Sequence, residues 1–471
     1  MTIDEIVNLL NNIAWGPWML VLLVGTGIFL SIRVGFLQFG KFGYAMKNTL
    51  GKVFKKTEAG EGEITPFQAV STALAATVGT GNIAGVTGAI AVGGPGAVFW
   101  MWVSALFGMV TKYAEVVLSV RYRERNDQGD WVGGPMYYIR NGMGKGWNWL
   151  ACVFCVLGAL AAFGIGNMTQ VNTIASSINN AINAFGGSTG AATFQMFGQI
   201  VPVSSIVIGV IVAGIVTMVL FGGIKRIGAV AERLVPVMAA IYILASVLVV
   251  LSNLGSIGKI VAMIFKGAFS AEAALGGAFG ITIMTTIQKG VGRGVFSNEA
   301  GLGSAPMAHA ATSERNPVMQ GMYGIFEVFM DTIVLCTLTA LTVLCGVEQG
   351  IAIEWGQSAG TELVSAAFGT VFGNKLGALL VAVGITLFAL STILSWSLYG
   401  TRCFEFLLGG RGLRLYQCLF VVMVVVGATL KLDLVWNIAD TLNGFMAIPN
   451  LIVLLALSGV VIKLTKEHFS K

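Results

Sequence analysis

The chain has 471 residues, of which 56% are hydrophobic and 11% are charged. Roughly a quarter of the residues in soluble domains are charged, so this composition excludes a soluble globular protein and indicates a polytopic membrane protein. The formal net charge of +6 can suggest a nucleic-acid partner, but the basic residues form short clusters between apolar segments. Orientation in a membrane explains that pattern better than nucleic-acid binding does.

Apolar windows of about 20 residues predict membrane spans. The chain begins without a basic region, so we interpret the first apolar window as a retained span and not as a cleaved signal peptide. Eleven spans are expected, at 13–32, 66–90, 96–120, 147–182, 203–222, 229–251, 268–290, 317–346, 373–400, 414–430 and 443–463.

The distribution of Lys and Arg supports this division and orients it. Of the 28 basic residues, 23 fall in alternate loops and the C-terminal tail on one side, whereas the loops of the other side hold only Lys259, Lys266, Lys375 and Lys431. Cytoplasmic loops carry an excess of Lys and Arg. We therefore expect a multi-pass protein of the cell (inner) membrane, with the N-terminus outside and the C-terminus in the cytoplasm.

The ten spans after the first divide into two sets of five, at 66–251 and 268–463. An odd number of spans in each set makes the second set inverted relative to the first. Residues 1–65 hold the first span and a basic cytoplasmic loop, and residues 464–471 form a cytoplasmic tail. The predicted fold is all-α, a five-plus-five inverted repeat with one additional N-terminal transmembrane helix.

Each set opens with an apolar segment that glycines interrupt. These are AATVGTGNIAGVTG at Ala75 to Gly88 and AALGGAFGITIMTTIQKG at Ala273 to Gly290. Glycine costs about 1 kcal/mol relative to alanine in a helix interior. Two Gly-broken helices in corresponding positions of inverted halves indicate the central site of a transporter; the alternative is that the glycines only allow close helix packing.

A broken helix exposes N–H groups on one half and C=O groups on the other, so it can bind both ends of a zwitterion. In the first segment the N–H groups around Thr80, Gly81 and Asn82 can hold a carboxylate, while the carbonyls of 75–78 face a cation. An amino acid is the natural small zwitterion.

Several long motifs resemble the alanine or glycine:cation symporter family over essentially the whole chain. The motifs are GTGNIAGV (79–86), GGPGAVFWMW (93–102), GGPMYY (133–138), RGVFSNEAGLGSAP (293–306) and WNIADTLNG (436–444). The resemblance implies a leucine-transporter-like fold that carries small neutral amino acids with Na+ or, occasionally, H+. Alanine and glycine are the expected substrates, and D-alanine and serine are further candidates.

The resemblance also implies a sodium site between the first broken helix and the eighth helix of the core. Its ligands would be the carbonyls of Ala75, Val78 and Phe388 and the hydroxyls of Ser391 and Thr392. Carbonyl and hydroxyl oxygens suit a hard cation that has lost its water. The alternative for the hydroxyls is a hydrogen bond to a carbonyl of their own helix.

Asn82 can contribute an oxygen to a second cation, with the carbonyl of Thr77 nearby, or it can cap the broken helix. Gln170 is expected to bind the substrate carboxylate, as the resemblance suggests, although a lone Gln in a membrane helix also serves as a link between helices.

The second broken helix offers further candidates for the substrate site. Gly276, Gly277 and Thr282 would supply its polar wall, and Phe163 and Phe279 would close a small apolar pocket that admits alanine and glycine. Ordinary core packing explains the two phenylalanines equally well.

Ionisable residues within a span are functional candidates. Glu327 and Asp331 lie four residues apart on one face of the eighth span, so they can form a proton-coupling site or a structural polar network. Lys112 and Glu115, three residues apart, are expected to pair with each other.

Three other functions are possible for such a sequence. An H+-coupled symporter of the same fold is the first alternative, and an ion channel, which more often has a repeated pore loop, is the second. An intramembrane enzyme lacks a catalytic constellation apart from Glu327 and Asp331, so no catalytic residues are expected. The two histidines and six cysteines offer little for a metal centre, and no cofactor is expected besides Na+ as the coupling ion.

Overall fold

The computed structural model describes residues 3–52, 59–196, 199–270, 282–357, 359–430 and 433–470. These ranges are almost entirely helical. Their strands form two short antiparallel hairpins, β1 (Glu124–Arg125) with β2 (Trp131–Val132) and β3 (Thr193–Met196) with β4 (Gln199–Pro202).

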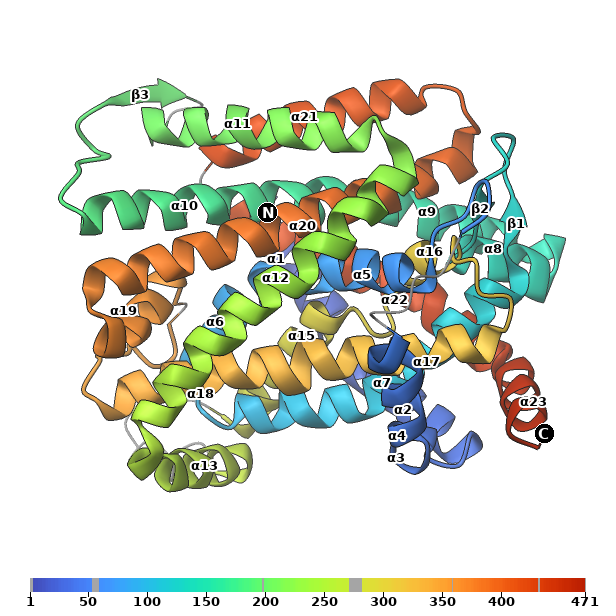
Figure 1. Cartoon of the computed structure of the whole chain (residues 1–471), viewed down its shortest axis with the longest axis horizontal. Coiled ribbons are helices and arrows are strands. Elements are labelled where there is room, and N and C mark those ends of the chain that lie inside the picture. Colours follow the sequence, from blue (N-terminus) through green and yellow to red (C-terminus); the bar gives the residue numbers. More distant parts are fainter. Residues whose placement is uncertain are drawn as a thin grey trace.

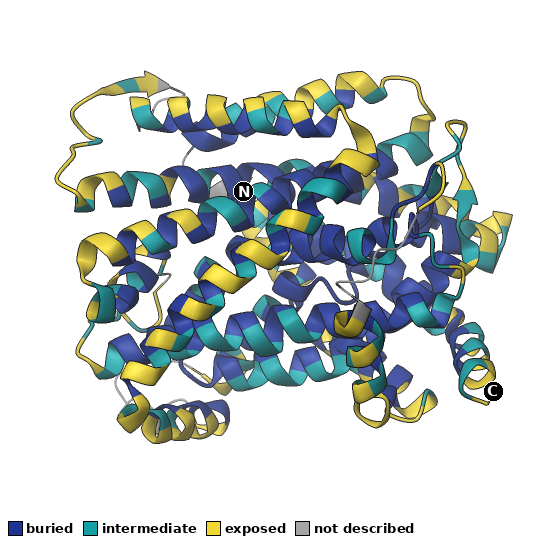
Figure 2. Ribbon diagram, in the orientation of Figure 1, coloured by how far each residue is buried: buried dark blue, intermediate teal, exposed yellow. Residues whose placement is uncertain are grey.

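Long helices lie side by side, with buried residues concentrated where they meet (Figures 1 and 2). Besides the two interrupted helices described below, the helices are α1 (Ile3–Ala14), α2 (Pro17–Arg33), α3 (Leu37–Gly40), α4 (Phe42–Thr49), α7 (Ala97–Tyr122), α8 (Pro135–Tyr138), α9 (Asn148–Phe163), α10 (Thr169–Ala184), α11 (Val203–Leu220), α12 (Gly223–Ser252), α13 (Leu254–Phe269), α17 (Pro317–Val328), α18 (Thr337–Glu348), α19 (Thr361–Phe372), α20 (Asn374–Leu408), α21 (Leu413–Thr429), α22 (Asp433–Ala456) and α23 (Ser458–Phe469). The 3₁₀ turns are η1 (Leu50–Lys52) and η4 (Lys145–Trp147), and π-helical turns occur at η3 (Ile139–Met143), η5 (Gly164–Met168) and η6 (Phe329–Cys336).

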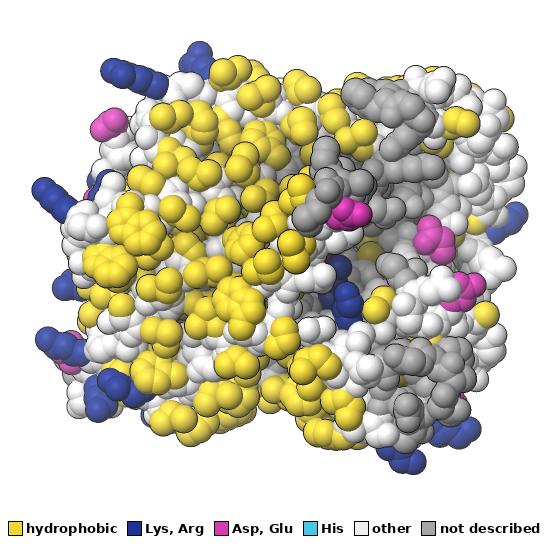
Figure 3. Space-filling view, turned by 180° about the vertical axis from the view of Figure 1, so that it is seen from behind, with side chains coloured by type: hydrophobic (Ala, Val, Ile, Leu, Met, Phe, Trp, Pro, Cys, Tyr) yellow, Lys and Arg dark blue, Asp and Glu magenta, His cyan; other side chains and the backbone are white. Residues whose placement is uncertain are grey.

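Among the described residues, eight helices are long and apolar enough to cross a membrane, or nine if one bent pair counts as a single span. Large apolar side chains such as Val21 and Leu415 are 72% and 65% exposed. Figure 3 shows hydrophobic side chains across much of one face, with Lys and Arg mainly along one edge. A large exposed apolar surface marks contact with lipid. The chain is therefore an all-α, multi-pass membrane protein, as expected.

The bent pair is the first Gly-interrupted segment. Its first half, α5 (Pro66–Thr77), begins at a capping box in which Thr65 and Gln68 each accept from the other's backbone N–H. The helix ends at Val78, and the π-helical turn η2 (Gly81–Gly85) leads into α6 (Val86–Gly93). The two halves meet at an angle of 48°, so the predicted break exists where the glycines begin.

The second interruption of the described chain lies later than predicted. The helix α15 (Ile283–Asn298) is continuous, and the chain leaves helical geometry only at Glu299, before the short helix α16 (Pro306–His309). Glu299, Gly301 and Gly303 have φ angles of 56°, 93° and 82°, which an L-residue helix cannot adopt. Residues 283–290 of the expected interrupted segment are thus helical, whereas Gly276, Gly277 and Gly280, the glycines expected to break it, lie outside the described part, so that break stays a prediction.

Hydropathy misplaced this helix because α15 faces protein and not lipid. Its N-terminal part meets α6 and α7: the Thr286 hydroxyl donates to the Gly93 carbonyl at 2.8 Å, and a Cβ on Gly290 would lie 2.4 Å from the Ala97 carbonyl oxygen. As a consequence, Lys289 and Arg293 belong to this helix and not to a cytoplasmic loop, where the count of basic residues had placed them.

The two interrupted helices are tied together at the start of α5 and the end of α16. Ile64 N–H donates to the Ala311 carbonyl at 3.0 Å, and Ser313 N–H donates to the Ile64 carbonyl at 2.8 Å. Beside this bridge the Glu63 carboxylate accepts from Trp131 and Arg315. A movement of α5 at this end therefore pulls on the segment that follows α16.

Glu63 is almost completely buried, and burial acts to raise its pKa, but hydrogen bonds from Trp131 and Arg315 outweigh that effect and hold the pKa below its ordinary value. A lowered pKa means that the ionised carboxylate stabilises the fold at neutral pH and that this stabilisation is lost as the pH falls through the lowered pKa.

We predict that Glu63→Gln lowers the free energy of unfolding by about 1 to 3 kcal/mol at pH 7, because a charged acceptor of several donors becomes neutral. The difference from wild type should shrink below about pH 4.3, the ordinary glutamate pKa. Thermal unfolding of the detergent-solubilised protein at several pH values measures this difference in stability. Glu61→Gln, which changes an exposed neighbour, is the control. A pH-independent difference would contradict the assigned role.

Candidate functional site

Oxygens of α5 and α20 gather where α5 ends. The Ser391 hydroxyl lies 3.2 Å from the Ala75 carbonyl oxygen and 2.7 Å from that of Phe388. The Thr392 hydroxyl lies 3.0 Å from the Ala75 oxygen and 3.1 Å from the Phe388 oxygen. All four residues are buried. The structure brings these four predicted ligands together, and it also contains the alternative bond of the hydroxyls to their own helix, through Phe388.

The remaining candidates for the cation lie at the same end of α5. Val78 is the residue at which the helix stops, and its N–H still donates to the Leu74 carbonyl at 2.7 Å. The Thr77 hydroxyl bonds to the carbonyls of Ala73 and Leu74 in its own helix. A cation at Ala75 would therefore lie beside the point where α5 loses its helical geometry.

Gly79 is the point where this oxygen cluster meets the next helix. A Cβ at this position would lie 2.5 Å from Thr392 Oγ1 and 3.3 Å from Gln170 Oε1. Only glycine allows both side chains to approach the backbone this closely. The backbone of Gly79 therefore separates the candidate cation ligands from the candidate substrate ligand by a single residue.

Gln170 bridges the break and the π-helical turn η5. Its Oε1 accepts from Thr80 N–H at 3.3 Å, and its Nε2 donates to the Ile165 carbonyl at 2.9 Å. The Thr80 hydroxyl is fully buried and has no hydrogen-bond partner within the described structure. The Gln170 oxygen thus occupies the position where a carboxylate oxygen could accept from the break. Gly81, next in the chain, lies against Phe296 and Ser297 of α15.

Asn82 connects the break to a carboxylate. Its Oδ1 accepts from Gly79 N–H at 2.9 Å, which caps the break, and its Nδ2 donates to Asp331 Oδ1 at 2.6 Å. Asp331 also accepts from Ser297 at 3.1 Å and from Thr332 at 2.7 Å. A fully buried carboxyl group needs a proton or a cation to neutralise it, so this group of oxygens can hold either.

Glu327 and Asp331, the two acids of the predicted coupling site or polar network, contact different partners. The π-helical turn η6 begins between them, and Glu327 instead lies 3.2 Å from Lys112 Nζ and 3.1 Å from His309 Nε2. Gln320 Nε2 faces His309 Nδ1 at 2.8 Å, so Nδ1 accepts and Nε2 carries the proton toward Glu327. The expected pairing of Lys112 with Glu115 is replaced by the pair Lys112–Glu327.

Glu115 and Glu299 stabilise the second interruption. Glu115 Oε1 accepts from the N–H groups of Gly301 and Gly303, both at 3.1 Å. Glu299 Oε1 accepts from the Trp396 indole at 2.8 Å. Leaving a buried donor without its acceptor costs about 1 to 3 kcal/mol. These acids act as fixed supports of the backbone.

The other predicted residues lie elsewhere. The Phe163 ring packs against Tyr416 and Phe420 of α21, with ring centres 4.9 Å and 5.9 Å away. Thr282 is exposed at the N-cap of α15, where it bonds to Thr285. Gly276, Gly277 and Phe279 lie outside the described residues and stay predictions.

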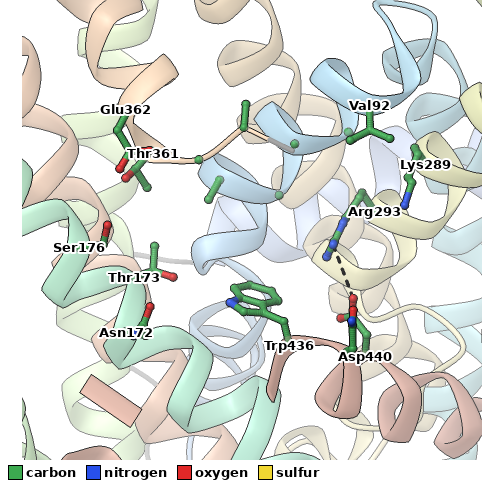
Figure 4. Close-up of a pocket in the computed structure, with 17 residues that line it drawn as sticks. Val92, Asn172, Thr173, Ser176, Lys289, Arg293, Thr361, Glu362, Trp436 and Asp440 are labelled. Carbon is green, nitrogen blue, oxygen red and sulfur yellow. Dashed lines mark ion pairs between the residues drawn. The ribbon is translucent and has the colours of Figure 1, made fainter. Parts of the chain in front are cut away.

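A cavity of about 460 Å³ opens on the side of the break where α6 and α15 lie. Figure 4 shows Arg293 of α15 and Asp440 of α22 pointing toward each other, with Trp436 to the left of Asp440. Arg293 Nη2 lies 3.6 Å from Asp440 Oδ2. Further lining residues are Asn172, Thr173, Ser176, Lys289, Thr361 and Glu362. The cavity therefore presents both signs of charge next to the break.

The sequence did not lead us to predict this charged cavity or the ion pair between Asp440 and Arg293. The signal was present, since Arg293, Trp436 and Asp440 belong to two of the quoted motifs. These motifs did not indicate a charged cavity because the predicted span ends at residue 290, which places Arg293 in the loop after it. Asn443, in the same motif as Asp440, is fully buried with neither side-chain atom hydrogen-bonded to the described residues.

Comparisons with known proteins agree with this architecture. The protein is 47% identical to the sodium/alanine symporter AgcS of Methanococcus maripaludis, over 99% of this chain and 97% of that one. It is 36% identical to the amino-acid carrier protein AlsT of Bacillus subtilis, over 99% of this chain and 92% of the relative.

A solved structure, MhsT in complex with L-phenylalanine, has a similar fold. The TM-score is 0.58, and the match covers 86% of this chain and 99% of MhsT at 14% sequence identity. The model of the sodium:alanine symporter family matches residues 1–471. The protein therefore belongs to the sodium:alanine symporter family, as the resemblance indicated, and is a transporter and not an enzyme.

Proposed function

We propose that the protein is a secondary transporter that carries small neutral amino acids, alanine and glycine foremost, together with Na+ by alternating access. The printed names of its relatives, a sodium/alanine symporter and an amino-acid carrier, support this choice. The observation that carries it is Gly79, whose backbone lies between Thr392 in the candidate cation site and Gln170 at the candidate substrate site.

The proposed topology has eleven spans. Nine candidate spans, the shorter helix α21 and the interrupted pair α15–α16 supply them, in two inverted sets of five (66–251 and 268–463) after the N-terminal helix, a leucine-transporter-like arrangement. Basic residues near Arg123, Arg140 and Arg402 support a cytoplasmic side at the start of α5, which places the N-terminus outside and the cavity toward the exterior.

In this proposal Na+ binds among the oxygens of Ala75, Val78, Phe388, Ser391 and Thr392. The two hydroxyls turn their protons away from the ion, and their oxygens coordinate it. Because Ala75 is within one turn of the break, the bound ion fixes the end of α5. A fixed break presents its N–H groups in one geometry, so Na+ raises the affinity for the amino acid, and the amino acid raises the affinity for Na+ by the same factor.

The amino-acid carboxylate accepts from the N–H groups of Thr80 and Gly81 and takes over the position of the Gln170 oxygen. The buried Thr80 hydroxyl, which lacks a described partner, offers a further donor. A small substrate side chain suits a site so close to Phe296, whose ring lies against Gly81. Counterflow against a panel of alanine, glycine, serine and D-alanine identifies the preferred substrate.

Asp331 supports a second candidate, in which H+ is the coupling ion or a second cation joins Na+. Its carboxylate accepts from Asn82, which caps the break, and from Ser297 of α15, so it contacts residues next to both interruptions. A proton or cation at Asp331 would act on both broken helices at once. Glu327, which Lys112 neutralises, is assigned a structural role.

We predict that Thr392→Ala raises the Na+ concentration for half-maximal alanine uptake at least about tenfold, because loss of a hydroxyl ligand to a charged group costs about 1.5 to 3 kcal/mol. Uptake into proteoliposomes at varied Na+ measures it. Thr386→Ala in the same helix, whose hydroxyl bonds to the Ala382 carbonyl, is the control. Wild-type sodium activation in Thr392→Ala would exclude this cation site.

Gln170→Ala is expected to raise the alanine concentration for half-maximal uptake about 3- to 10-fold. Once the substrate carboxylate has replaced the Gln170 oxygen at Thr80 N–H, the amide Nε2 of Gln170 donates to that carboxylate, and the variant lacks this donor. Sodium activation at saturating alanine should change little. Uptake into proteoliposomes at varied alanine and at varied Na+ measures the half-saturating alanine concentration and the sodium activation separately. Asn183→Ala, at the exposed C-terminal end of α10, serves as control. An unchanged half-saturation value would remove Gln170 from the site.

Asp331→Asn distinguishes the coupling ions. If Asp331 carries a transported proton, the variant loses uptake driven by a pH gradient and keeps Na+-driven uptake. If Asp331 binds a second Na+, the steepness of sodium activation falls. Cys336→Ser changes a neutral neighbour that also contacts Asn82 and is the control. A variant with wild-type uptake under both gradients would assign Asp331 to structure alone.

A further inference from the structure

The N-terminal helix α1 lies along one face of α22. Asn11 Nδ2 donates to the Asn437 carbonyl at 3.3 Å and to the Thr441 hydroxyl at 3.2 Å. The end of α1 approaches Gly444, where a Cβ would lie 3.0 Å from that of Ala14. Positions 437, 441 and 444 share a helix face. These contacts join α1 to the same half of α22 that carries Asp440.

Apolar side chains on the opposite face of α1 point outward. Ile6, Leu9, Leu10 and Ile13 are 43%, 50%, 39% and 44% exposed. With α2 the helix forms a continuous apolar element from Glu5 to Arg33, 29 residues long, which at 1.5 Å per residue is longer than a bilayer core of about 30 Å. This element is anchored in lipid by α2, so its other end can hold α22 in place.

Trp15 sits between α22 and α15. Its indole N–H donates to the backbone carbonyl of Asp440 at 2.9 Å. On the other side, a Cβ added to Gly292 of α15 would lie 3.8 Å from its ring. Gly292 is the residue before Arg293. Trp15 therefore bonds to the backbone of Asp440 and faces the backbone of the residue next to Arg293, with room between them for about one methyl group.

The ion pair separates two cavities. A second cavity, of about 330 Å³, lies behind the pair and is lined by the N-terminal segment (Asn11, Asn12, Trp15) and by α15 and α22. The cavity of about 460 Å³ beside the break is called the entrance cavity here. Both cavities are lined by Lys289, Arg293 and Asp440. Space on both sides leaves the two charged side chains free to separate, and the pair is already 3.6 Å apart. Its geometry therefore depends on the distance between the two helix backbones.

We propose that Trp15 is a positioning residue for the entrance: α1 and Trp15 hold α22 at a fixed distance from α15, so that Asp440 faces Arg293. The pair closes the outer end of the entrance cavity when α15 and α22 approach and opens it when they separate. The proposal rests on the proposed function in one respect, that the amino acid enters through this cavity.

The test compares Trp15→Phe with Trp18→Phe. Phenylalanine keeps an aromatic ring, although a smaller one than indole, and lacks the N–H donor. Trp18 is the matched control, because its N–H donates to the Ile13 carbonyl within the N-terminal segment at 2.7 Å. We expect Trp15→Phe to raise the alanine concentration for half-maximal uptake about 2- to 10-fold, the effect of one lost hydrogen bond, with the maximal rate and sodium activation unchanged. Trp18→Phe should leave all three unchanged.

A double-mutant cycle tests whether Trp15 acts through Asp440. In the Asp440→Asn background, Trp15→Phe should change the half-saturation value less than twofold, because the ion pair that Trp15 positions is already lost. Asn11→Ala, which breaks α1 from α22 at another point, should reproduce the effect of Trp15→Phe. Equal effects of Trp15→Phe with and without Asp440 would overturn the proposal, as would a Trp15→Phe protein that behaves like Trp18→Phe.

A second readout does not require transport. A cysteine introduced by Ser176→Cys lines the entrance cavity, and its rate of modification by a membrane-impermeant maleimide reports how open the cavity is, with the native cysteines of the unsubstituted protein as blank. Trp15→Phe should raise this rate at least about twofold, which corresponds to the loss of a weak hydrogen bond, and Trp18→Phe should not. If alanine is not transported at all, the proposed function fails, and the labelling rate still decides for or against the role of Trp15.

Discussion

A helix that is interrupted inside a membrane leaves backbone N–H and C=O groups without helical partners, and lipid cannot replace them. Each interruption here is satisfied by polar side chains. Asn82 accepts from Gly79, Gln170 of α10 accepts from Thr80, and Glu115 of α7 accepts from the glycines of the second interruption. Asn82 and Asn298 cap the interruptions locally, and the other partners come from other helices. The breaks are therefore also the places where neighbouring helices are linked.

This constraint provides a physical basis for coupling. The backbone groups of a break can exchange a side chain for a ligand at low cost, because an acceptor of similar chemistry is already in place. In the proposed function, the Gln170 oxygen occupies the position that the substrate carboxylate takes over, and the hydroxyls of Ser391 and Thr392 lie at the proposed Na+ site. Since Gly79 touches both groups, a ligand on one side changes the geometry that the other side meets.

The two kinds of ion pair in the structure suit two different tasks. Lys112 and Glu327 are fully buried, 3.2 Å apart, with His309 on the second carboxylate oxygen. Breaking such a pair leaves an uncompensated charge, so it acts as a fixed support. Arg293 and Asp440 are partly exposed, 3.6 Å apart, and water can replace each partner. A pair of this kind can open and close repeatedly.

The sequence by itself determined the class of protein, the family, the first broken helix and the hydroxyl pair of Ser391 and Thr392, because hydropathy, clustered glycines and long motifs are local properties of the chain. Tertiary structure decided the rest. It revealed an interruption at Glu299, after α15, whose polar residues, among them Gln288, Lys289 and Arg293, gave this helix a weak hydropathy signal. It also decided which charged residues pair. Lys112 pairs with Glu327 and not with Glu115, and Asp440 pairs with Arg293, because partners on different helices are set by packing distance and not by spacing along the chain.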